Sequence, residues 1–359
     1  MKLGFFTMPM HPIGKDWQLS LRQDREAFIL ADQLGFVEGY VGEHATDPEE
    51  NITSSALFLA TLIDATKTMK LGTGTLNMPN HHPAALACHM AMLDHLLAGR
   101  FILGISPGAL PSDAEVFGNI DMARPAMFLE AINQVLKLWQ TDPPYNIEGK
   151  FWNLSTERTY IPETGMGTIP KPLQRPHPPV VCTAVTPFSP GIAEAAARGW
   201  DPISANFLYP KWVKTHWTKY VEGCERIQRV PDFANWRVAK TVFVARDEAT
   251  AQRYGTGSDG PYFYYYRSLF SKLKRRGALG VFKEDPAEPD DSVTLEKVIE
   301  KLVIHGTADK VADQLLALKE ETGEFGTLLY AGVDWTDPDL ARQSMVLTAE
   351  KVLPLVNAA

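Results

Sequence analysis

The chain has 359 residues, of which 45% are hydrophobic and 22% charged, so it can bury a large core. Its 35 Lys and Arg against 43 Asp and Glu give a net charge of −8, which argues against nucleic-acid binding, because phosphate contacts need excess positive charge. Three cysteines make no disulfide framework, and no run approaches the ~20 apolar residues that span a bilayer. We therefore expect a cytoplasmic protein that binds neither nucleic acid nor a membrane.

Apolar residues along the chain switch repeatedly between the short runs typical of buried strands and the spacing typical of helices. Eight runs predict strands, at 3–7, 36–43, 70–78, 101–105, 180–185, 202–207, 237–245 and 325–333. Helices are expected between them, for example from Ser20 to Gly35, from Pro83 to Gly99 and from Pro125 onward. Eight alternating units predict a parallel (β/α)8 TIM barrel, with an open doubly wound sheet as the alternative.

Two segments interrupt this alternation. Residues 141–179 lack periodicity and are rich in proline, and residues 255–291 look irregular around an aromatic block, Tyr262–Tyr266. We expect one barrel domain over residues 1–359 that carries both segments as insertions. The aromatic block could cover an apolar substrate, form a subunit contact or pack in the core.

Polar residues follow the second and third predicted strands, where a barrel of this kind places its active site. His44 ends the second strand and is a candidate general acid or base, because imidazole titrates near neutral pH. The alternative is a histidine that merely closes the strand through a backbone hydrogen bond. Glu43 should point to the opposite side of the strand and act structurally. His81 and His82 are expected to cap the next helix or line the pocket rim, and no metal site is predicted.

Glycines inside the third predicted strand, Gly72 and Gly74, indicate a bulge, unusual backbone or the close approach of a ligand. They are not a dinucleotide fingerprint, since no third glycine follows at the required spacing. Residues 104–108 match the G-x-S-x-G pattern of serine hydrolases. However, Pro107 and the loop after it do not make the strand–turn–helix elbow that this nucleophile needs.

The segment Thr183–Ser189 leads from the fifth predicted strand into a helix. Hydroxyl and N–H groups at a helix start can bind a phosphate, although an ordinary helix cap has the same composition. Arg124, just before Pro125, could add a positive charge or pair with Asp121 at the surface.

Seven motifs together resemble the bacterial luciferase-like flavin monooxygenases, nearest the branch of limonene monooxygenase-like and diketocamphane monooxygenases. In chain order they are Val41-Gly42-Glu43-His44, Leu71-Gly72-Thr73-Gly74-Thr75, His81-His82-Pro83, Leu93-Asp94-His95 with Gly99-Arg100-Phe101, residues 104–113, Arg124-Pro125, and residues 305–312. They cover most of the chain in the expected order.

The resemblance implies a two-component enzyme that borrows FMNH2 from a separate flavin reductase. The flavin would react with O2 at C4a, and the resulting peroxide would insert one oxygen atom into a small apolar ketone, aldehyde or terpene. Members are commonly homodimers. Three alternatives remain: an F420-dependent hydride-transfer oxidoreductase of the same fold, a non-catalytic flavin-binding protein, and a metal-dependent barrel hydrolase.

Motif positions then imply roles for individual residues. His44 corresponds to the active-site histidine of the family, and Gly74-Thr75 to a non-prolyl cis peptide beneath the flavin ring. Residues 255–291 correspond to the mobile lid of the family. The residues expected to contact the cofactor are Gly74, Thr75, Ser106, Arg124, Thr186 and Ser189. Those expected to line a substrate pocket that excludes water are Phe6, Met8, Met78 and Phe207.

Overall fold

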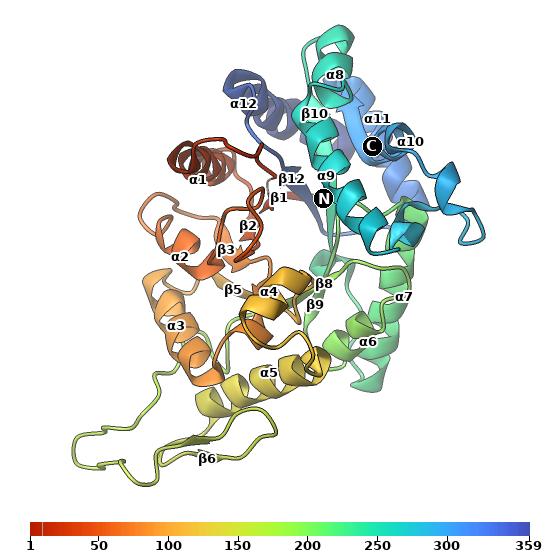
Figure 1. The fold of residues 1–359 in the computed structure, drawn as a ribbon. Coiled ribbons are helices and arrows are strands. Elements are labelled where there is room, and N and C mark those ends of the chain that lie inside the picture. Colours follow the sequence, from red (N-terminus) through yellow and green to blue (C-terminus); the bar gives the residue numbers. More distant parts are fainter. Residues whose placement is uncertain (9) are drawn as a thin grey trace.

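A computed structural model describes residues 1–8 and 10–359, and in this part of the chain eight parallel strands close into a barrel (Figure 1). The strands are β1 (Lys2–Thr7), β2 (Glu38–Val41), β3 (Lys70–Thr73), β5 (Phe101–Ser106), β8 (Val180–Ala184), β9 (Asp201–Ser204), β10 (Arg237–Val244) and β12 (Thr327–Gly332). Each strand pairs with the next, and β12 completes the ring by pairing with β1. The TIM barrel is confirmed. The open sheet is wrong, because β9–β10 and β12–β1 pairing leaves these strands no free edge.

Helices surround the barrel and occupy the connections between strands (Figure 1). They are α1 (Trp17–Gln33), α2 (Ser55–Ala60), α3 (Pro83–Leu96), α4 (Pro111–Val116), α5 (Arg124–Gln140), α6 (Pro190–Ala196), α7 (Pro210–Arg226), α8 (Glu248–Gly255), α9 (Pro261–Arg275), α10 (Leu295–Leu302), α11 (Ala308–Thr322), α12 (Pro338–Leu347) and α13 (Leu353–Ala358).

The expected start of the first helix at Ser20 was wrong. Asp16 caps α1 by accepting a hydrogen bond from the Leu19 backbone N–H, so the helix begins at Trp17. Ser20 lies buried one turn inside, where its hydroxyl donates to the Asp16 carbonyl. Asp and Ser are equally good caps, so residue type alone could not distinguish Asp16 from Ser20.

Hydrophobic side chains fill the inside of the barrel. Six strands contribute to this layer, which consists of Tyr40, Ile102, Val181, Ile203, Ala239 and Leu329. On β3 the layer is completed by a glycine: a Cβ on Gly72 would stand 2.6 Å from the ring of Tyr40. The group that closely approaches Gly72 is therefore the Tyr40 ring of the chain itself.

The third predicted strand, 70–78, is divided in two. β3 ends at Thr73, and a short strand, β4 (Leu76–Asn77), resumes the pairing with β5. Between them the Gly74–Thr75 peptide bond is cis, as the resemblance implied. A 3-10 turn, Met78–Asn80, then leads to α3.

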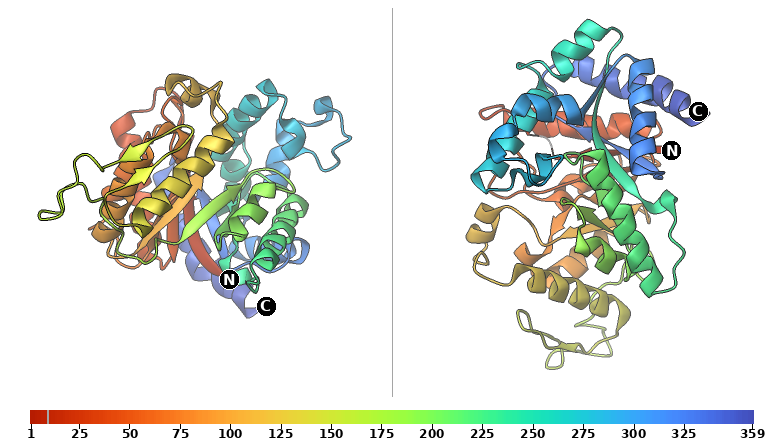
Figure 2. Two further views of the ribbon diagram at one scale, coloured as in Figure 1. Left: turned by 90° about the horizontal axis from the view of Figure 1, so that it is seen from below. Right: turned by 90° about the vertical axis from the view of Figure 1, so that its right-hand side faces the viewer.

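The segment 141–179 forms an arm that projects beside α5 (Figure 2). It contains a hairpin of β6 (Asn146–Ile147) and β7 (Leu154–Ser155). Glu130 on α5 anchors the arm, because its carboxylate accepts hydrogen bonds of 2.9 Å from three successive backbone N–H groups, at residues 150–152.

The expectation that residues 255–291 are irregular was wrong, because α9 occupies much of the segment. Tyr262, Tyr265 and Tyr266 from the aromatic block are buried in a second core between α8, α9 and α10. Of the three readings of the block, core packing therefore holds for these side chains. Helical periodicity was hidden because the two half-buried positions of the block, Phe263 and Tyr264, are aromatic as well.

Two further features bear on the outline of the molecule. An unexpected strand, β11 (Val303–Gly306), pairs with β10 outside the barrel. Met1 and Asn357 exchange hydrogen bonds of 2.9 and 3.0 Å, so the two ends of the chain lie side by side (Figure 2). Among the described residues, no helix combines the length and the apolar character needed to cross a membrane.

Candidate functional site

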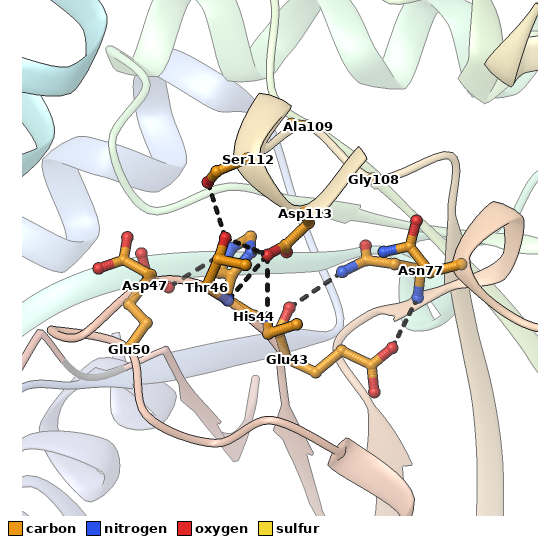
Figure 3. A network of polar contacts seen from close by, with 12 residues as sticks. Glu43, His44, Thr46, Asp47, Glu50, Asn77, Gly108, Ala109, Ser112 and Asp113 are labelled. Atoms are coloured by element: carbon orange, nitrogen blue, oxygen red, sulfur yellow. Dashed lines mark hydrogen bonds and ion pairs between the residues drawn. The ribbon is translucent and has the colours of Figure 1, made fainter. Parts of the chain in front are cut away.

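His44 lies just beyond the C-terminal end of β2, between two carboxylates from different parts of the chain (Figure 3). Its Nδ1 is 2.9 Å from Oδ2 of Asp113 on α4, and its Nε2 is 3.7 Å from Oε2 of Glu50. Only 13% of the His44 side chain is exposed. Burial disfavours the imidazolium, but the Asp113 hydrogen bond and the Glu50 and Asp47 charges outweigh it and raise the His44 pKa.

Asp113 is held rigidly against the loop that follows β2. Besides contacting His44, its carboxylate accepts hydrogen bonds from the backbone N–H groups of Ala45 and Thr46, at 3.1 and 2.9 Å, and from the Thr46 hydroxyl at 2.6 Å. Burial acts to raise the Asp113 pKa, but these donors outweigh it and the pKa is lowered. Asp113 is therefore an anion whose position fixes the orientation of the His44 ring.

Glu50 is the second carboxylate at His44, and it is 8% exposed. Its Oε2 has no hydrogen-bond partner within residues 1–8 and 10–359. Burial, the largest effect, raises the Glu50 pKa. A small cavity, with room for about one water molecule, lies beside this pair. Its lining residues are Met8, Gly42, Glu43, His44, Glu50 and Ile52.

Glu43 points away from this pair, as the strand alternation predicted. Its carboxylate accepts from the backbone and hydroxyl of Ser55, at 2.9 and 2.7 Å, and from the Asn77 backbone at 3.0 Å. His81 Nε2 lies 3.2 Å from the same carboxylate, and the His82 ring accepts from the Ala84 N–H as a helix cap. These groups fix the ends of β2 and β4 relative to α2 and α3.

Thr75 and Ser106, two predicted cofactor residues, are joined in a chain of polar groups. The Thr75 hydroxyl donates to Ser106 Oγ at 2.7 Å, and Ser106 donates onward to Asn77 Oδ1 at 3.0 Å. The Gly108 N–H also donates to Ser106, at 3.1 Å. Since the partners that the described residues provide include no histidine, Ser106 lacks the base of a hydrolytic nucleophile.

Arg124 lies at the start of α5, next to the loop that follows β5. Its guanidinium donates to the Pro107 carbonyl at 2.6 Å and to the side chains of Asn80 and Asn119. The structure therefore brings Gly74, Thr75, Ser106 and Arg124 to two neighbouring strand ends.

Thr186 and Ser189 follow β8, the next strand around the barrel. In the described part of the chain the Ser189 side chain makes no capping hydrogen bond to α6. The Thr186 side chain is exposed, while its carbonyl lies 2.9 Å from Nε2 of the buried His216.

The four predicted pocket residues fall in three places. Phe6 and Met8, at the end of β1, pack over Gly74 and Gly42, respectively, and Met8 also lines the cavity beside His44. Phe207 is half-buried after β9, against both the main core and the core around α9. Met78 is 1% exposed within the main hydrophobic core, packed with residues of α3 and α5.

Asp113 and Glu50 were missed by the reasoning from sequence. Asp113 ends one of the motifs that carried the resemblance, which was the available signal, but α4 was taken as loop. Glu50 had no signal, because its meeting with His44 depends on the path of the loop between β2 and α2.

A family model described as luciferase-like monooxygenase matches residues 1–324. The chain belongs to this family. The recognised resemblance is thereby confirmed, and with it the expectation of an enzyme.

Three relatives that match over most of their length are also named monooxygenases. The chain is 30% identical to 4-hydroxyprotoasukamycin monooxygenase of Streptomyces nodosus subsp. asukaensis, over 100% of this chain and 93% of the relative. It is 26% identical to limonene 1,2-monooxygenase of Rhodococcus erythropolis, over 99% and 86%. It is also 28% identical to the oxygenase component of trigonelline monooxygenase of Acinetobacter baylyi, over 80% and 77%.

A solved structure matches nearly the whole fold. It is the oxygenating constituent of 3,6-diketocamphane monooxygenase of Pseudomonas putida, a type II Baeyer-Villiger monooxygenase in complex with FMN. The TM-score is 0.88 at 28% identity, covering 99% of this chain and 98% of that one.

Proposed function

We propose that the chain is the oxygenating component of a two-component monooxygenase. It would receive reduced FMN from a separate flavin reductase and insert one oxygen atom from O2 into a small apolar ketone, aldehyde or terpene. The observation that carries the proposal is a buried histidine, held between two carboxylates, beside a cavity at the mouth of the barrel. A relative named as an oxygenase component and a similar structure in complex with FMN support it.

The residues at the strand ends fit a flavin. The half-buried Thr75 and Ser106 hydroxyls, joined to each other and to the Asn77 amide, are a donor and acceptor set that suits the polar edge of an isoalloxazine. Arg124, with the hydroxyls of Thr186 and Ser189, would hold the phosphate. When bound, reduced FMN supplies the electrons that activate O2, and one oxygen atom of that O2 reaches the substrate.

The His44 side chain would hold the proton that the reaction needs. Asp113 fixes the Nδ1–H, which leaves Nε2 directed to the cavity side. Because its pKa is raised, His44 keeps its second proton, at Nε2, to higher pH than an ordinary imidazole does. Phe6 and Met8 would keep the reacting atoms dry.

The cavity at His44 has room for about one water molecule, whereas sites for drug-sized ligands span about 300–1,000 Å³, so a ligand would lie at its mouth rather than inside it. We infer that residues 255–291, and α9 above all, act as the lid that the resemblance implied. The single barrel domain, the two insertions and the homodimer stay predictions.

The test is an anaerobic titration with FMNH2, followed by mixing with oxygenated buffer and a panel of cyclic ketones, aldehydes and terpenes. We expect FMNH2 to bind and oxygen consumption to be coupled to an oxygenated product. Turnover with reduced F420 and not with FMNH2 would favour the hydride-transfer alternative. Tight flavin binding without substrate-dependent oxygen consumption would favour the non-catalytic one.

A further inference from the structure

One face of α9 rests on an acidic loop next to His44. Tyr264, Ser268 and Lys272 follow one another at intervals of four residues, so they share a face of the helix. The Tyr264 hydroxyl donates to Glu49 Oε1 at 2.7 Å, and Ser268 donates to the other oxygen of Glu49. The helix is therefore docked through its side chains onto the loop between β2 and α2.

Lys272 is the cation at the centre of this contact. Its Nζ lies 2.5 Å from Asp47, 3.1 Å from Glu49 and 3.5 Å from Glu50 Oε1. The lysine side chain is 28% exposed, whereas those of Asp47 and Glu50 are 6% and 9% exposed. One ammonium thus faces three largely buried carboxylates.

Glu50 connects Lys272 to the candidate active site. One of its oxygens faces Lys272 at 3.5 Å, and the other faces Nε2 of His44 at 3.7 Å and has no hydrogen-bond partner among the described residues. A buried carboxylate with so few donors remains ionised only where nearby positive charge compensates its burial.

We propose that Lys272 is a positioning residue that acts through Glu50: while α9 is docked, its charge keeps a carboxylate anion against the Nε2 edge of His44. The charge of the site histidine is then coupled to the position of the lid helix. This inference deepens the proposed function and rests on it for the role of His44, but the electrostatic coupling itself can be measured without any flavin.

The direction of the effect follows from the neighbouring charges. The groups that face Glu50 are His44, Asp47, Lys272 and Tyr265. Burial and Asp47 raise the pKa of Glu50, whereas His44 and Lys272 lower it. Without Lys272, Glu50 should therefore take up a proton, and His44 should lose the anion at 3.7 Å. Asp113 and Asp47 remain as charges near His44.

The experiment is a pH titration of His44 by NMR, in protein labelled at histidine Cε1 and free of flavin. The chain has nine histidines, so the His44 signal is identified by its loss in His44→Gln. We expect Glu50→Gln to lower the His44 titration midpoint by roughly one pH unit, from the loss of a charge at this distance. Lys272→Met should also lower the His44 midpoint. The double variant Glu50→Gln, Lys272→Met should lower the midpoint no further than Glu50→Gln alone.

Two further variants separate coupling from structural damage. Lys274→Met removes an exposed lysine from the same helix and should leave the midpoint unchanged. Lys272→Arg keeps the cation, so its His44 midpoint should lie close to that of the unchanged protein. This result would be diagnostic even if the methionine variant folds poorly. In the loaded enzyme, Lys272→Met should also move the pH profile of kcat toward lower pH.

An unchanged or raised His44 midpoint in folded Lys272→Met would overturn the proposal, as would an unchanged midpoint in Glu50→Gln. Neither result would touch the proposed function, which depends on flavin binding and oxygen transfer. Conversely, failure to bind FMNH2 would remove that function and leave the titration result standing.

Discussion

At the scale of single residues, the molecule places a histidine where its two ring nitrogens face different carboxylates. Asp113 is fully hydrogen bonded and fixed, whereas Glu50 has an oxygen without a partner in the described part of the chain. This asymmetry assigns Nδ1 to orientation and leaves Nε2 for proton transfer.

Replacing His44 with Ala tests that assignment. The imidazole lies at the edge of the proposed flavin site, so FMNH2 affinity should stay within a few-fold. Product formed per O2 consumed should fall by about 100-fold, the scale of a lost general acid. Affinity is measured by anaerobic titration and coupling by oxygen electrode with product analysis. Undiminished product yield would remove His44 from the chemistry.

Asp113→Asn keeps the shape of the side chain but removes its charge. The raised pKa of His44 depends on that charge, so its imidazolium should be lost at lower pH. We expect the alkaline limb of the oxygenation rate to move toward acid by about one pH unit. If the alkaline limb of the pH–rate profile does not move in Asp113→Asn, that limb reports the titration of a group other than His44.

At the scale of elements, the glycines of the barrel show which strands lie unusually close. A Cβ on Gly104 of β5 would collide with the Thr73 carbonyl oxygen of β3, which is backbone and cannot turn aside. The same two residues are also joined by a hydrogen bond, in which the Thr73 hydroxyl donates to the Gly104 carbonyl at 2.7 Å.

Gly104→Ala should therefore force β3 and β5 apart and destabilise the fold by about 1–3 kcal/mol. Gly280 lies in open space, so Gly280→Ala is a matched control that should leave the free energy of unfolding nearly unchanged. Urea unfolding followed by circular dichroism measures both variants. Equal stability would mean that the strands can shift without cost.

The strands and helices differ in how well the sequence alone could predict them. The eight barrel strands were predictable because each is a short apolar run between helices of regular spacing. β11 was not, because four residues that include His305 carry too little pattern. α9 was not, because its first turns are an unbroken run of aromatic residues, which shows no helical spacing. His44 could be found from its place at a strand end, whereas Asp113 and Glu50 meet it only through tertiary folding.

At the scale of the whole molecule, a buried polar cluster ties the start of the barrel to its end. The His11 ring lies 2.6 Å from Asp334, which follows β12, and 3.1 Å from Asp24 on α1, while Lys15 also contacts Asp334 at 2.5 Å. Burial opposes charge on His11, but the two carboxylates outweigh it and raise its pKa from 6.5 to about 9.

Because the folded pKa of His11 exceeds the unfolded one, its stabilising effect is complete below pH 6.5 and is lost as pH rises through about 9. We expect the free energy of unfolding to fall by about 2–3 kcal/mol over that interval. His11→Asn should be less stable at pH 6 and lack this slope, whereas exposed His89→Asn should keep it. Denaturant titrations at several pH values decide the matter, and an equal slope in both variants would exclude His11 as its source.

The seam of the barrel has a consequence for biosynthesis. Lys2 of β1 pairs with Thr327 of β12. During translation, one edge of β1 therefore remains unpaired until β12 has left the ribosome. A chain terminated early keeps two exposed sheet edges, which are templates for aggregation. Nonsense mutations near the 3′ end of the gene should therefore yield insoluble protein rather than a shortened enzyme.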